Sequence, residues 1–490
     1  MHLLCRASAI RAIEAASFAR GEALMPRAGL AAASAAQTLA GGSARRILVL
    51  AGPGNNGGDA FEAACHLRGW GTEVTLAFAA DPARLPTDAA LAHARWCQAG
   101  GTSSTELPDP AQFELVIDGL FGIGLGRAIG TPYDAWIAAV NAAGVPVLAL
   151  DVPSGLDADS GAASGVTIRA DTTVTFIADK PGLHTGDGVD LAGRVEVAAL
   201  DLRVGAPFGR EVGSLLARAD FAGLLAPRRR NSHKGTYGTL VIVGGASGMV
   251  GAAILAARAG LKLGAGRVIA GLLDGSGLAY DPPYPEIMIR DARSALASNA
   301  GAVVAGPGMG GSKAAREALE AAIAASCTLV LDADALNIVA ADPRLAAQVS
   351  RRSAPTIMTP HPLEAARLAG TNVARVNADR IGTALSLAHV YQAHVLLKGA
   401  GSVIATPSER WWINPTGNPG MAAGGMGDAL AGIIGALVAR HEDVESALKC
   451  ATFLHGAAAD TLVDAGVGPA GLTAGETIDA ARRQLNAWRT

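Results

Sequence analysis

Short apolar runs alternate with helical segments along the first half of the chain. Helical patterning extends to residue 40, and a further helix is predicted near 60–68. The predicted strands are 46–51, 73–79, 115–118, 146–151 and 172–177. Continuous apolar strands separated by helices are typical of a parallel sheet covered by helices on both faces. We therefore expect an α/β domain.

The second half repeats this pattern without repeating the sequence. Its predicted strands are 240–243, 267–270, 302–305, 328–332, 356–359 and 394–398. A long Ala-rich helix is predicted at 251–263, and the final helices are expected to start at Gly427 and Glu445. A segment with two prolines and an arginine run, 205–230, separates the halves. We predict two α/β domains, 1–215 and 216–490.

The composition argues against several classes of function, including nucleic-acid binding and membrane spanning. Half of the 490 residues are hydrophobic but only 4% are aromatic, and 62 glycines suit many tight turns between strands and helices. With 40 basic and 43 acidic residues, no excess of positive charge is available for nucleic acid. No apolar stretch reaches the roughly 18 residues that a membrane span needs. The five scattered cysteines fit a reducing compartment, so we expect a cytoplasmic protein with small-molecule partners.

A glycine-rich segment near the C-terminus carries the clearest chemical signal. Gly424, Gly425 and Gly427 surround Met426 and precede Asp428 at the start of an apolar helix, predicted from Ala429 onward. Backbone N–H groups at such a helix N-terminus attract anions, and the carboxylate is placed to deprotonate a hydroxyl beside a phosphate. The alternative is that Asp428 is an ordinary N-cap.

Three polar clusters follow predicted strands of the first half. They are AGPGNNGGD at 51–59, DGLFGIGLGR at 118–127 and DVPSG at 151–155. The first is neither a dinucleotide fingerprint nor a phosphate loop with lysine, and it is either a ligand-holding turn or a surface turn. Carboxylates ending two strands, with Asn and Ser oxygens, predict a site for a hard cation, either monovalent or magnesium.

Together with TFIADKPG at 175–182, these clusters resemble the NAD(P)H-hydrate epimerase family. The resemblance covers nearly all of the first half and implies a Rossmann-like three-layer fold. It implies that Asn56, Asp118 and Ser154 bind a potassium ion. The substrate-binding residues that it implies are Asn55, Asn56, Gly57, Gly58, Asp59, Gly122, Ile123, Gly124, Leu125, Gly126, Arg127, Ala128 and Asp151.

The epimerisation requires little acid–base machinery. The hydrated nicotinamide has its hydroxyl beside a ring nitrogen, so the C–O bond can ionise with help from that nitrogen. One carboxylate that shuttles the proton suffices. Asp151 is the first candidate for this catalytic role, and Lys180 is a weaker one.

Six motifs of the second half resemble the ADP-dependent NAD(P)H-hydrate dehydratase family, which has a ribokinase-like fold. In order they are HKGTYGTLVIVGGASGMV at 233–250, GPGMG at 306–310, LDADALN at 331–337, TPHPLE at 359–364, KGAGS at 398–402 and GGMGD at 424–428. The fusion of both families in one chain is characteristic of bifunctional NAD(P)H-hydrate repair enzymes, and the resemblance implies a homo-oligomer.

This second resemblance implies that ADP phosphorylates the hydroxyl of the S hydrate and that phosphate then leaves, giving NAD(P)H and AMP. Asp428 is the implied catalytic base, and backbone amides around Gly425–Gly427 stabilise the moving phosphoryl group with Mg²⁺. The implied ADP-binding residues are Lys398, Gly399, Ala400, Gly401, Ser402 and Gly427. The implied contacts to the hydrated dinucleotide are Ala252, Gly308, His361 and Asp428.

Some positions leave alternatives open. Met426 replaces the usual Thr and Leu363 the usual Gly of the family motifs. His361 is either a substrate contact or a loop residue without a role, and Asp332 and Asp334 are interpreted as simple helix caps. The competing function is a small-alcohol kinase of the ribokinase superfamily, with a non-catalytic binding domain at its N-terminus.

Overall fold

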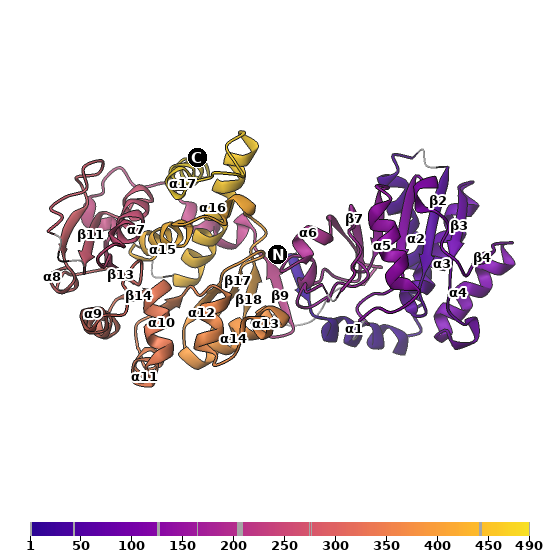
Figure 1. Ribbon diagram of the computed structural model, residues 1–490, viewed down its shortest axis with the longest axis horizontal. Coiled ribbons are helices and arrows are strands. Elements are labelled where there is room, and N and C mark those ends of the chain that lie inside the picture. The colour runs from indigo at the N-terminus through magenta and orange to yellow at the C-terminus, as the bar shows by residue number, and fades with distance from the viewer. Residues whose placement is uncertain are drawn as a thin grey trace. The chain divides into compact units, whose positions relative to one another are not determined.

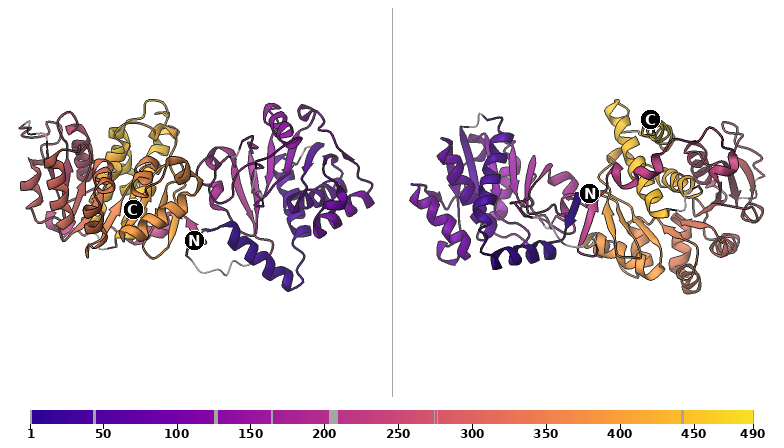
Figure 2. Two further views of the ribbon diagram at one scale, coloured as in Figure 1. Left: turned by 60° about the horizontal axis from the view of Figure 1, so that its bottom comes forward. Right: turned by 180° about the vertical axis from the view of Figure 1, so that it is seen from behind.

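The computed structural model describes residues 2–42, 45–124, 128–163, 165–202, 209–273, 275, 277–440 and 443–489. The chain forms two compact units, Leu3–Gly213 and Ser214–Thr490 with Met1–His2. Each unit contains its own β-sheet and its own helices (Figures 1 and 2). Within the described residues, none of the helices combines the length and the apolar character that crossing a membrane requires.

The N-terminal unit contains a seven-stranded sheet in the order β4-β3-β2-β5-β6-β7-β8, and every ladder in it is parallel. Its strands are β2 (Arg46–Ala51), β3 (Glu73–Ala77), β4 (Ser103–Ser104), β5 (Leu115–Gly119), β6 (Val147–Leu150), β7 (Thr172–Phe176) and β8 (Arg194–Ala198). Strand β1 (His2–Cys5) precedes them in the sequence. Its helices are α1 (Ala7–Ala19), α2 (Met25–Leu39), α3 (Asn55–Gly69), α4 (Thr87–Gln98), α5 (Tyr133–Ala142) and α6 (Gly188–Leu191), with short 3₁₀ helices η1 (Pro82–Arg84), η2 (Pro110–Gln112) and η3 (Pro181–Leu183).

Alternate residues of the central strand β2 enter two different cores. Ile47 and Val49 belong to the core that α2, α3 and α4 cover, whereas Leu48 and Leu50 belong to the core beneath α5. Successive side chains of a strand point to opposite faces, so β2 is buried on both sides. The three-layer α/β arrangement predicted from its continuous apolar sequence is confirmed.

The glycine segment after β2 is part of a helix and not a loop. Helix α3 begins at Asn55, five residues before the predicted start, so both asparagines and both glycines lie in its first turns. Gly57 has no room for a side chain, because a Cβ there would lie 1.9 Å from the carbonyl oxygen of Gly52. The glycine therefore lets the helix N-terminus approach the turn that follows β2.

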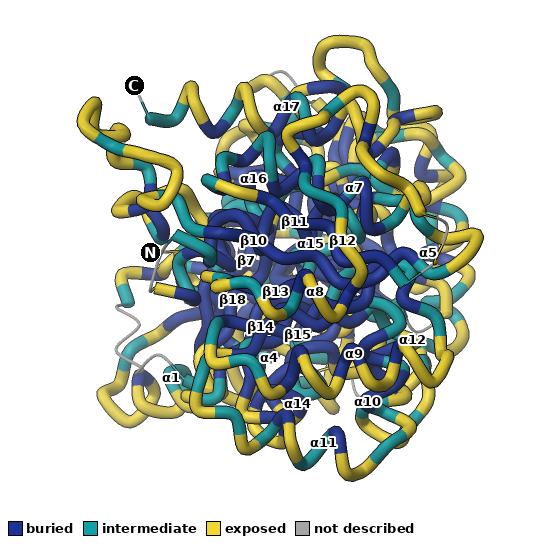
Figure 3. The backbone as a smooth tube through the Cα atoms, turned by 90° about the vertical axis from the view of Figure 1, so that its left-hand side faces the viewer, coloured by how far each residue is buried: buried dark blue, intermediate teal, exposed yellow. Residues whose placement is uncertain are grey.

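The sheet of the C-terminal unit has the order β9-β18-β17-β16-β15-β14-β13-β10-β11-β12. Its strands are β9 (Val212–Leu215), β10 (Thr239–Gly244), β11 (Arg267–Leu272), β12 (Met288–Asp291), β13 (Ala302–Ala305), β14 (Thr328–Leu331), β15 (Thr356–Met358), β16 (His394–Leu397), β17 (Val403–Ala405) and β18 (Trp411–Ile413). The ladders from β12 to β16 are parallel, whereas β17 pairs antiparallel with both β16 and β18. Strands β10, β13 and β14 lie in the buried interior (Figure 3).

The helices of this unit surround that sheet. They are α7 (Val250–Lys262), α8 (Ala292–Leu296), α9 (Lys313–Ala324), α10 (Ala333–Ala341), α11 (Pro343–Ser350), α12 (Pro362–Leu368), α13 (Val373–Ala378), α14 (Arg380–Tyr391), α15 (Met426–Val438), α16 (Val444–Asp464) and α17 (Ala474–Ala487). The 3₁₀ helices are η4 (Arg218–Leu225), η5 (Lys234–Tyr237) and η6 (Pro419–Met421). Helix α15 packs against α7 and α16 and is buried over nearly its whole length, as expected for a helix that is apolar on every side.

Close packing of α15 on α7 depends on Gly432. A Cβ at Gly432 would lie 2.1 Å from the carbonyl oxygen of Ala256 and 2.8 Å from the Cβ of Ala259. We predict that Gly432→Ala lowers the free energy of unfolding by about 1–3 kcal/mol, because the two helices must move apart. Chemical denaturation of the full chain measures this change.

The matched control is Gly475→Ala in α17, where a Cβ would meet no atom within 4 Å. This substitution should raise stability by roughly 0.5–1 kcal/mol, because alanine is the better helix former. Equal effects of the two substitutions would contradict the packing argument.

Candidate functional sites

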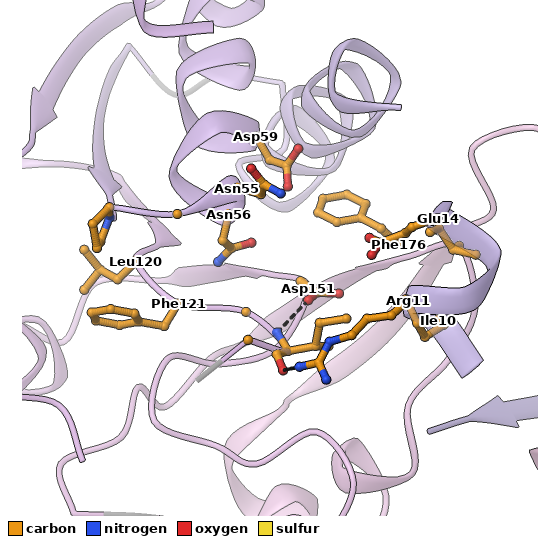
Figure 4. Close-up of a pocket in the computed structure, with 16 residues that line it drawn as sticks. Ile10, Arg11, Glu14, Asn55, Asn56, Asp59, Leu120, Phe121, Asp151 and Phe176 are labelled. Carbon is orange, nitrogen blue, oxygen red and sulfur yellow. Dashed lines mark hydrogen bonds between the residues drawn. The ribbon is translucent and has the colours of Figure 1, made fainter. Parts of the chain in front are cut away.

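A cavity of about 660 Å³ opens at the carboxyl ends of the strands in the N-terminal unit. Figure 4 shows its walls, to which α1, α3 and the segments after β5, β6 and β7 contribute. Its lining residues are Ile10, Arg11, Glu14, Pro53, Gly54, Asn55, Asn56, Asp59, Leu120, Phe121, Gly122, Ile123, Gly124, Asp151, Phe176 and Ile177. Open α/β sheets bind ligands at this edge.

Asp151 is held rigidly at the floor of the cavity. It follows β6 directly and has a φ of 68°, in the left-handed region that few residues other than glycine, asparagine and aspartate adopt. Its Oδ1 accepts a hydrogen bond from Lys180 Nζ at 2.6 Å, and its Oδ2 accepts one from the Ile123 amide at 3.0 Å. Both interactions stabilise the charged carboxylate.

Lys180 positions Asp151 and does not itself line the cavity. Its side chain is fully buried, and its ammonium group donates to Asp151 Oδ1, to Thr175 Oγ1 and to the Phe176 carbonyl, the latter two both at 2.8 Å. An ammonium group has three protons, so all of its donors are used.

Of the three residues predicted to bind potassium, Asn56 lines the cavity, whereas Asp118 and Ser154 are not among its lining residues. Asp118 and Ser154 are fully buried, and the Ser154 hydroxyl donates to Asp118 Oδ1 at 2.7 Å. Burial raises the pKa of Asp118 to about 6 against the opposing hydrogen bonds from Ser154 and Leu120. The amide oxygen and nitrogen of Asn56 are buried without any hydrogen-bond partner. A buried carboxylate without a cationic partner and an unpaired amide oxygen suit a bound cation.

Two further carboxylates face the cavity. Asp59 projects from α3 and Glu14 from α1 (Figure 4). Burial, then the charges of Asp151 and Glu14, raise the pKa of Asp59 well above its usual value. Burial and Asp151 also raise the pKa of Glu14. The guanidinium of Arg11, one helical turn before Glu14, donates to the Ile123 carbonyl at 3.1 Å.

Most of the predicted substrate contacts lie at this cavity. Asn55, Asn56, Asp59, Gly122, Ile123, Gly124 and Asp151 line it. Gly57 and Gly58 are buried within α3, and Ala128 is not among the lining residues. Leu125, Gly126 and Arg127 lie outside the described residues. Sequence reasoning missed Ile10, Arg11 and Glu14, whose only signal was their helical spacing.

In the C-terminal unit, the predicted motifs lie in the loops after adjacent strands. Gly245 and Ala246, after β10, donate backbone hydrogen bonds to the carbonyls of Pro307 and Gly308, after β13, at 2.9 and 2.7 Å. A Cβ at Gly308 would lie 3.1 Å from that of Ala252, so these two predicted substrate contacts are neighbours. The structure thus brings the GGASG and GPGMG motifs together.

Asp428 lies in the first turn of α15, and the N-cap of that helix is Gly425, which has a φ of 87°. The helix starts at Met426, one residue before Gly427 and three before Ala429, the two predicted starts, and no side chain caps it. The alternative interpretation of Asp428 as an ordinary N-cap is therefore wrong. Burial, then the negative charges of Asp332 and Asp334, raise the pKa of Asp428 to about 6, against the effect of Lys398.

A partly buried ion pair, in which only the carboxylate is fully enclosed, lies beside Asp428. Lys398 Nζ donates to Asp332 Oδ1 at 2.7 Å, and the Thr359 hydroxyl donates to the same oxygen at 2.8 Å. Burial lowers the pKa of Lys398, but nearby carboxylates, chiefly Asp332, outweigh it and raise that pKa overall. A Cβ at Gly427 would lie 3.5 Å from Lys398 Nζ, so the ammonium group faces the N-terminus of α15.

The interpretation of Asp332 and Asp334 as simple helix caps is wrong. The Asp332 carboxylate does not cap α10 but binds Lys398 and Thr359, and Asp334 Oδ2 accepts from the Gly310 amide at 2.8 Å. Both residues follow β14, whose end lies between those of β13 and β15. They therefore connect separate loops of the site, which their local sequence did not reveal.

The remaining predicted residues form ordered turns at the same edge. Ser402 Oγ accepts from the Gly399 amide at 3.2 Å and donates to the Gly399 carbonyl at 2.9 Å, which closes the KGAGS turn. His361 caps α12, because its Nδ1 accepts from the amides of Leu363 and Glu364, while Glu364 Oε2 accepts from the His361 amide. His361 therefore has a structural role, and its predicted substrate contact stays a prediction.

Two family models match the chain. Residues 21–182 match the YjeF-related protein N-terminus, and residues 240–479 match NAD(P)H-hydrate dehydratase. A crystal structure of the ADP/ATP-dependent NAD(P)H-hydrate dehydratase from Bacillus subtilis, co-crystallised with ATP and Mg²⁺, is 32% identical with a TM-score of 0.50. It covers 56% of this chain and 97% of its own. The fold and sites thus define a two-domain α/β protein with a ribokinase-like C-terminal unit.

Relatives match across both units. The bifunctional NAD(P)H-hydrate repair enzyme Nnr of Coxiella burnetii is 39% identical over 90% of this chain and 91% of its own length. The enzyme of the same name from Escherichia coli is 38% identical over 94% and 89%. The chain belongs to the family of bifunctional NAD(P)H-hydrate repair enzymes. Since both units match, this family is favoured over a small-alcohol kinase with a non-catalytic N-terminal domain.

The buried ion pair of Lys180 with Asp151 should contribute to the stability of the N-terminal unit. We predict that Lys180→Met lowers the free energy of unfolding by about 3–5 kcal/mol, because it leaves the Asp151 charge buried and unpaired. The double variant Lys180→Met/Asp151→Asn should recover much of that loss. Urea unfolding at neutral pH measures both.

The matched control is Arg20→Met, which breaks the exposed pair of Arg20 with Glu22. Its effect on the free energy of unfolding should be much smaller than that of Lys180→Met, because exposed ion pairs contribute little. A loss no greater for Lys180→Met than for Arg20→Met would contradict the role given to Lys180.

Proposed function

We propose that the chain is a two-step repair enzyme for hydrated NADH and NADPH. The N-terminal unit interconverts the R and S hydrates, and the C-terminal unit dehydrates the S hydrate at the expense of ADP, releasing AMP and phosphate. The observation that supports this most directly is that both matched regions contain an acidic centre, with Asp151 beside the fully buried Lys180 and Asp428 beside the partly buried Lys398. The sequence-based expectation of a homo-oligomer stays a prediction.

In the N-terminal unit, the cavity supplies what binding a dinucleotide requires. It combines the α3 N-terminus, which favours phosphate, with the apolar side chains of Phe121 and Phe176, against which a flat ring can pack. Asp151 is fixed by Lys180 and Ile123 at one side of this space. We assign it the transfer of a proton to and from the substrate hydroxyl.

The potassium site rests on the chemistry of its donors. Asp118, Ser154 and Asn56 would hold the ion, since they offer a carboxylate, a hydroxyl and an amide oxygen, and the amide oxygen has no other partner. When bound, the cation would compensate the buried charge of Asp118. Asp118 and Ser154 also anchor the segment after β5, because Ser154 Oγ accepts from the Phe121 amide at 2.9 Å.

In the C-terminal unit, Asp428 would remove the proton of the substrate hydroxyl as that oxygen attacks the β-phosphate of ADP. The Lys398 ammonium group, fixed by Asp332, lies near the amides of the α15 N-terminus and would neutralise charge on the transferred phosphoryl group. Phosphate then leaves from the ring carbon, helped by the lone pair of the ring nitrogen. Phosphorylation thus converts a poor leaving group into a good one.

Mg²⁺ would be held chiefly by the diphosphate. Among the described residues, no group of three or more histidine, cysteine or acidic side chains is arranged to hold a metal ion. Magnesium commonly binds through one or two carboxylates together with substrate phosphates, and Asp332 and Asp428 are the carboxylates nearest the α15 N-terminus. When bound, the ion would neutralise charge on the diphosphate.

We predict that Asp428→Asn lowers the ADP-dependent dehydration rate about 10²–10⁴-fold, the usual effect of losing a general base. Recovery of reduced-nicotinamide absorbance from the S hydrate measures this rate, and epimerisation by the same protein should be unchanged. In the unsubstituted chain, kcat/KM should fall below pH about 6, because the base must be ionised and its pKa is about 6.

A matched control is Asp342→Asn, which removes an exposed acidic cap of α11. Dehydration by this variant should stay within about twofold of the unsubstituted chain. If Asp428→Asn dehydrates the S hydrate as fast as that control, Asp428 is not the base.

We also predict that K⁺ raises the unfolding temperature of the N-terminal unit relative to a large organic cation at equal ionic strength. Saturation to 100 times Kd would add about 2.7 kcal/mol. Asp118→Asn should abolish the response. Without K⁺, stability should rise as the pH falls through about 6, because the folded state binds the Asp118 proton more tightly than the unfolded state.

The control for this experiment is Asp109→Asn, an acidic cap of η2 outside the cavity, which should leave the potassium response intact. Undiminished stabilisation by K⁺ in Asp118→Asn would contradict the proposed ligand set.

A further inference from the structure

Three carboxylates from three different elements surround the N-terminal cavity. Glu14 comes from α1, Asp59 from α3 and Asp151 from the end of β6. In Figure 4, Asp59 lies on one side of the cavity and Asp151 on the opposite side, with Glu14 at the edge between them. Proton transfer at a single ring face requires only one carboxylate, so the presence of Glu14 and Asp59 beside Asp151 needs an explanation.

The stereochemistry of epimerisation explains why more than one carboxylate is present, if the N-terminal unit is the epimerase proposed above. The R and S hydrates differ in which face of the nicotinamide ring carries the hydroxyl. If that hydroxyl leaves as water from one face and water returns on the other, a proton must be delivered on the first face and removed on the second. A single fixed carboxylate reaches one face only, because proton transfer needs hydrogen-bond distance.

The two opposed carboxylates have different surroundings. Asp151 is ion-paired with Lys180 and accepts an amide hydrogen bond from Ile123. Burial, then the charges of Asp151, Glu14 and Glu62, raise the pKa of Asp59, and Lys180 opposes this only weakly. Carboxylates held in such different surroundings take the roles of acid and base in other enzyme sites.

We propose that Asp59 is a second catalytic residue of the epimerase site, working on the ring face opposite to Asp151. Protonated Asp59 donates its proton to a hydroxyl on its own face, the C–O bond breaks with its electron pair leaving on water, and the ring nitrogen lone pair forms a C=N bond. Water then adds to that carbon from the other face, the C=N electrons return to nitrogen, and Asp151 takes the proton.

The step balances without an oxidant or reductant. One water leaves, one water enters, and one proton moves from Asp59 to Asp151. The reverse sequence converts the other epimer. Glu14 lines the same cavity and is close enough to influence the pKa of Asp59. The proton returns from Asp151 to Asp59 through solvent. Every epimerisation therefore replaces the oxygen of the substrate hydroxyl with an oxygen from water.

Isotope exchange tests this proposal in the full chain. Each purified hydrate epimer is incubated in oxygen-18-labelled water with the unsubstituted protein, with Asp59→Asn or with Asp151→Asn, and both label and configuration are followed. We expect Asp59→Asn to invert the substrate about 10²-fold more slowly or worse. It should still exchange label with retained configuration in one epimer, and Asp151→Asn should do so in the other epimer.

Two further variants and a folding check serve as controls for this test. Asp59→Glu, which retains an acid on the same helix, should restore part of the inversion that Asp59→Asn loses. Asp190→Asn, an exposed acidic change in α6, should behave as the unsubstituted chain. ADP-dependent dehydration and the unfolding temperature of each variant show whether it is folded.

Two results would overturn the second catalytic residue while leaving epimerisation itself intact. One is inversion by folded Asp59→Asn within about threefold of the unsubstituted rate. The other is equal loss of exchange in both epimers, which would indicate a binding role only. If the unsubstituted chain neither inverts nor exchanges above the enzyme-free rate, the epimerase function fails, and this proposal fails with it.

Discussion

Parallel pairing is the constraint on which both sites depend. All ladders of the N-terminal sheet are parallel, as are those from β12 to β16 in the C-terminal unit, so the carboxyl ends of neighbouring strands meet at one edge. Residues distant in sequence, such as Asp118 and Ser154 or Asp332 and Lys398, become neighbours for this reason alone. The helices that cover the sheets then determine what each edge can bind.

The two sites share an electrostatic arrangement although their folds differ in detail. In each, a lysine forms an ion pair with one carboxylate, Lys180 with Asp151 and Lys398 with Asp332. A second carboxylate nearby lacks a cation of its own, and burial together with the first carboxylate raises its pKa, as at Asp59 and Asp428. Carboxyl groups with raised pKa values result from this combination of burial and unequal pairing.

The sequence predicted helices and strands better than it predicted the tertiary contacts between them. Strands such as β2 and β13 follow directly from their unbroken apolar runs, and the three-layer fold follows from them. Helix starts were placed too late at Asn55 and Met426, because the glycines there suggest a loop. At Gly57 the carbonyl of Gly52 leaves no room for a Cβ, so the glycine is required within the helix. Local patterns contain no information about such tertiary approaches.

The same limit applies to the site residues. The motif residues that end strands were found, since their position in the sequence fixes their place at the sheet edge. Glu14 on α1 was not, because nothing in its helical pattern indicates which loop the helix covers. Asp332 was misinterpreted as a cap, since its partner Lys398 is 66 residues away in the sequence. Pairings of this kind become visible only in three dimensions.

The left-handed backbone of Asp151 restricts how this position can change during evolution. Glutamate would keep the charge but must adopt a conformation that long side chains rarely take, whereas glycine would keep the conformation and lose the carboxylate. Asparagine satisfies the backbone and removes the charge that Lys180 requires. Among the common residues only aspartate combines the left-handed backbone with the negative charge. A substitution of Asp151 therefore costs either the backbone conformation or the charge.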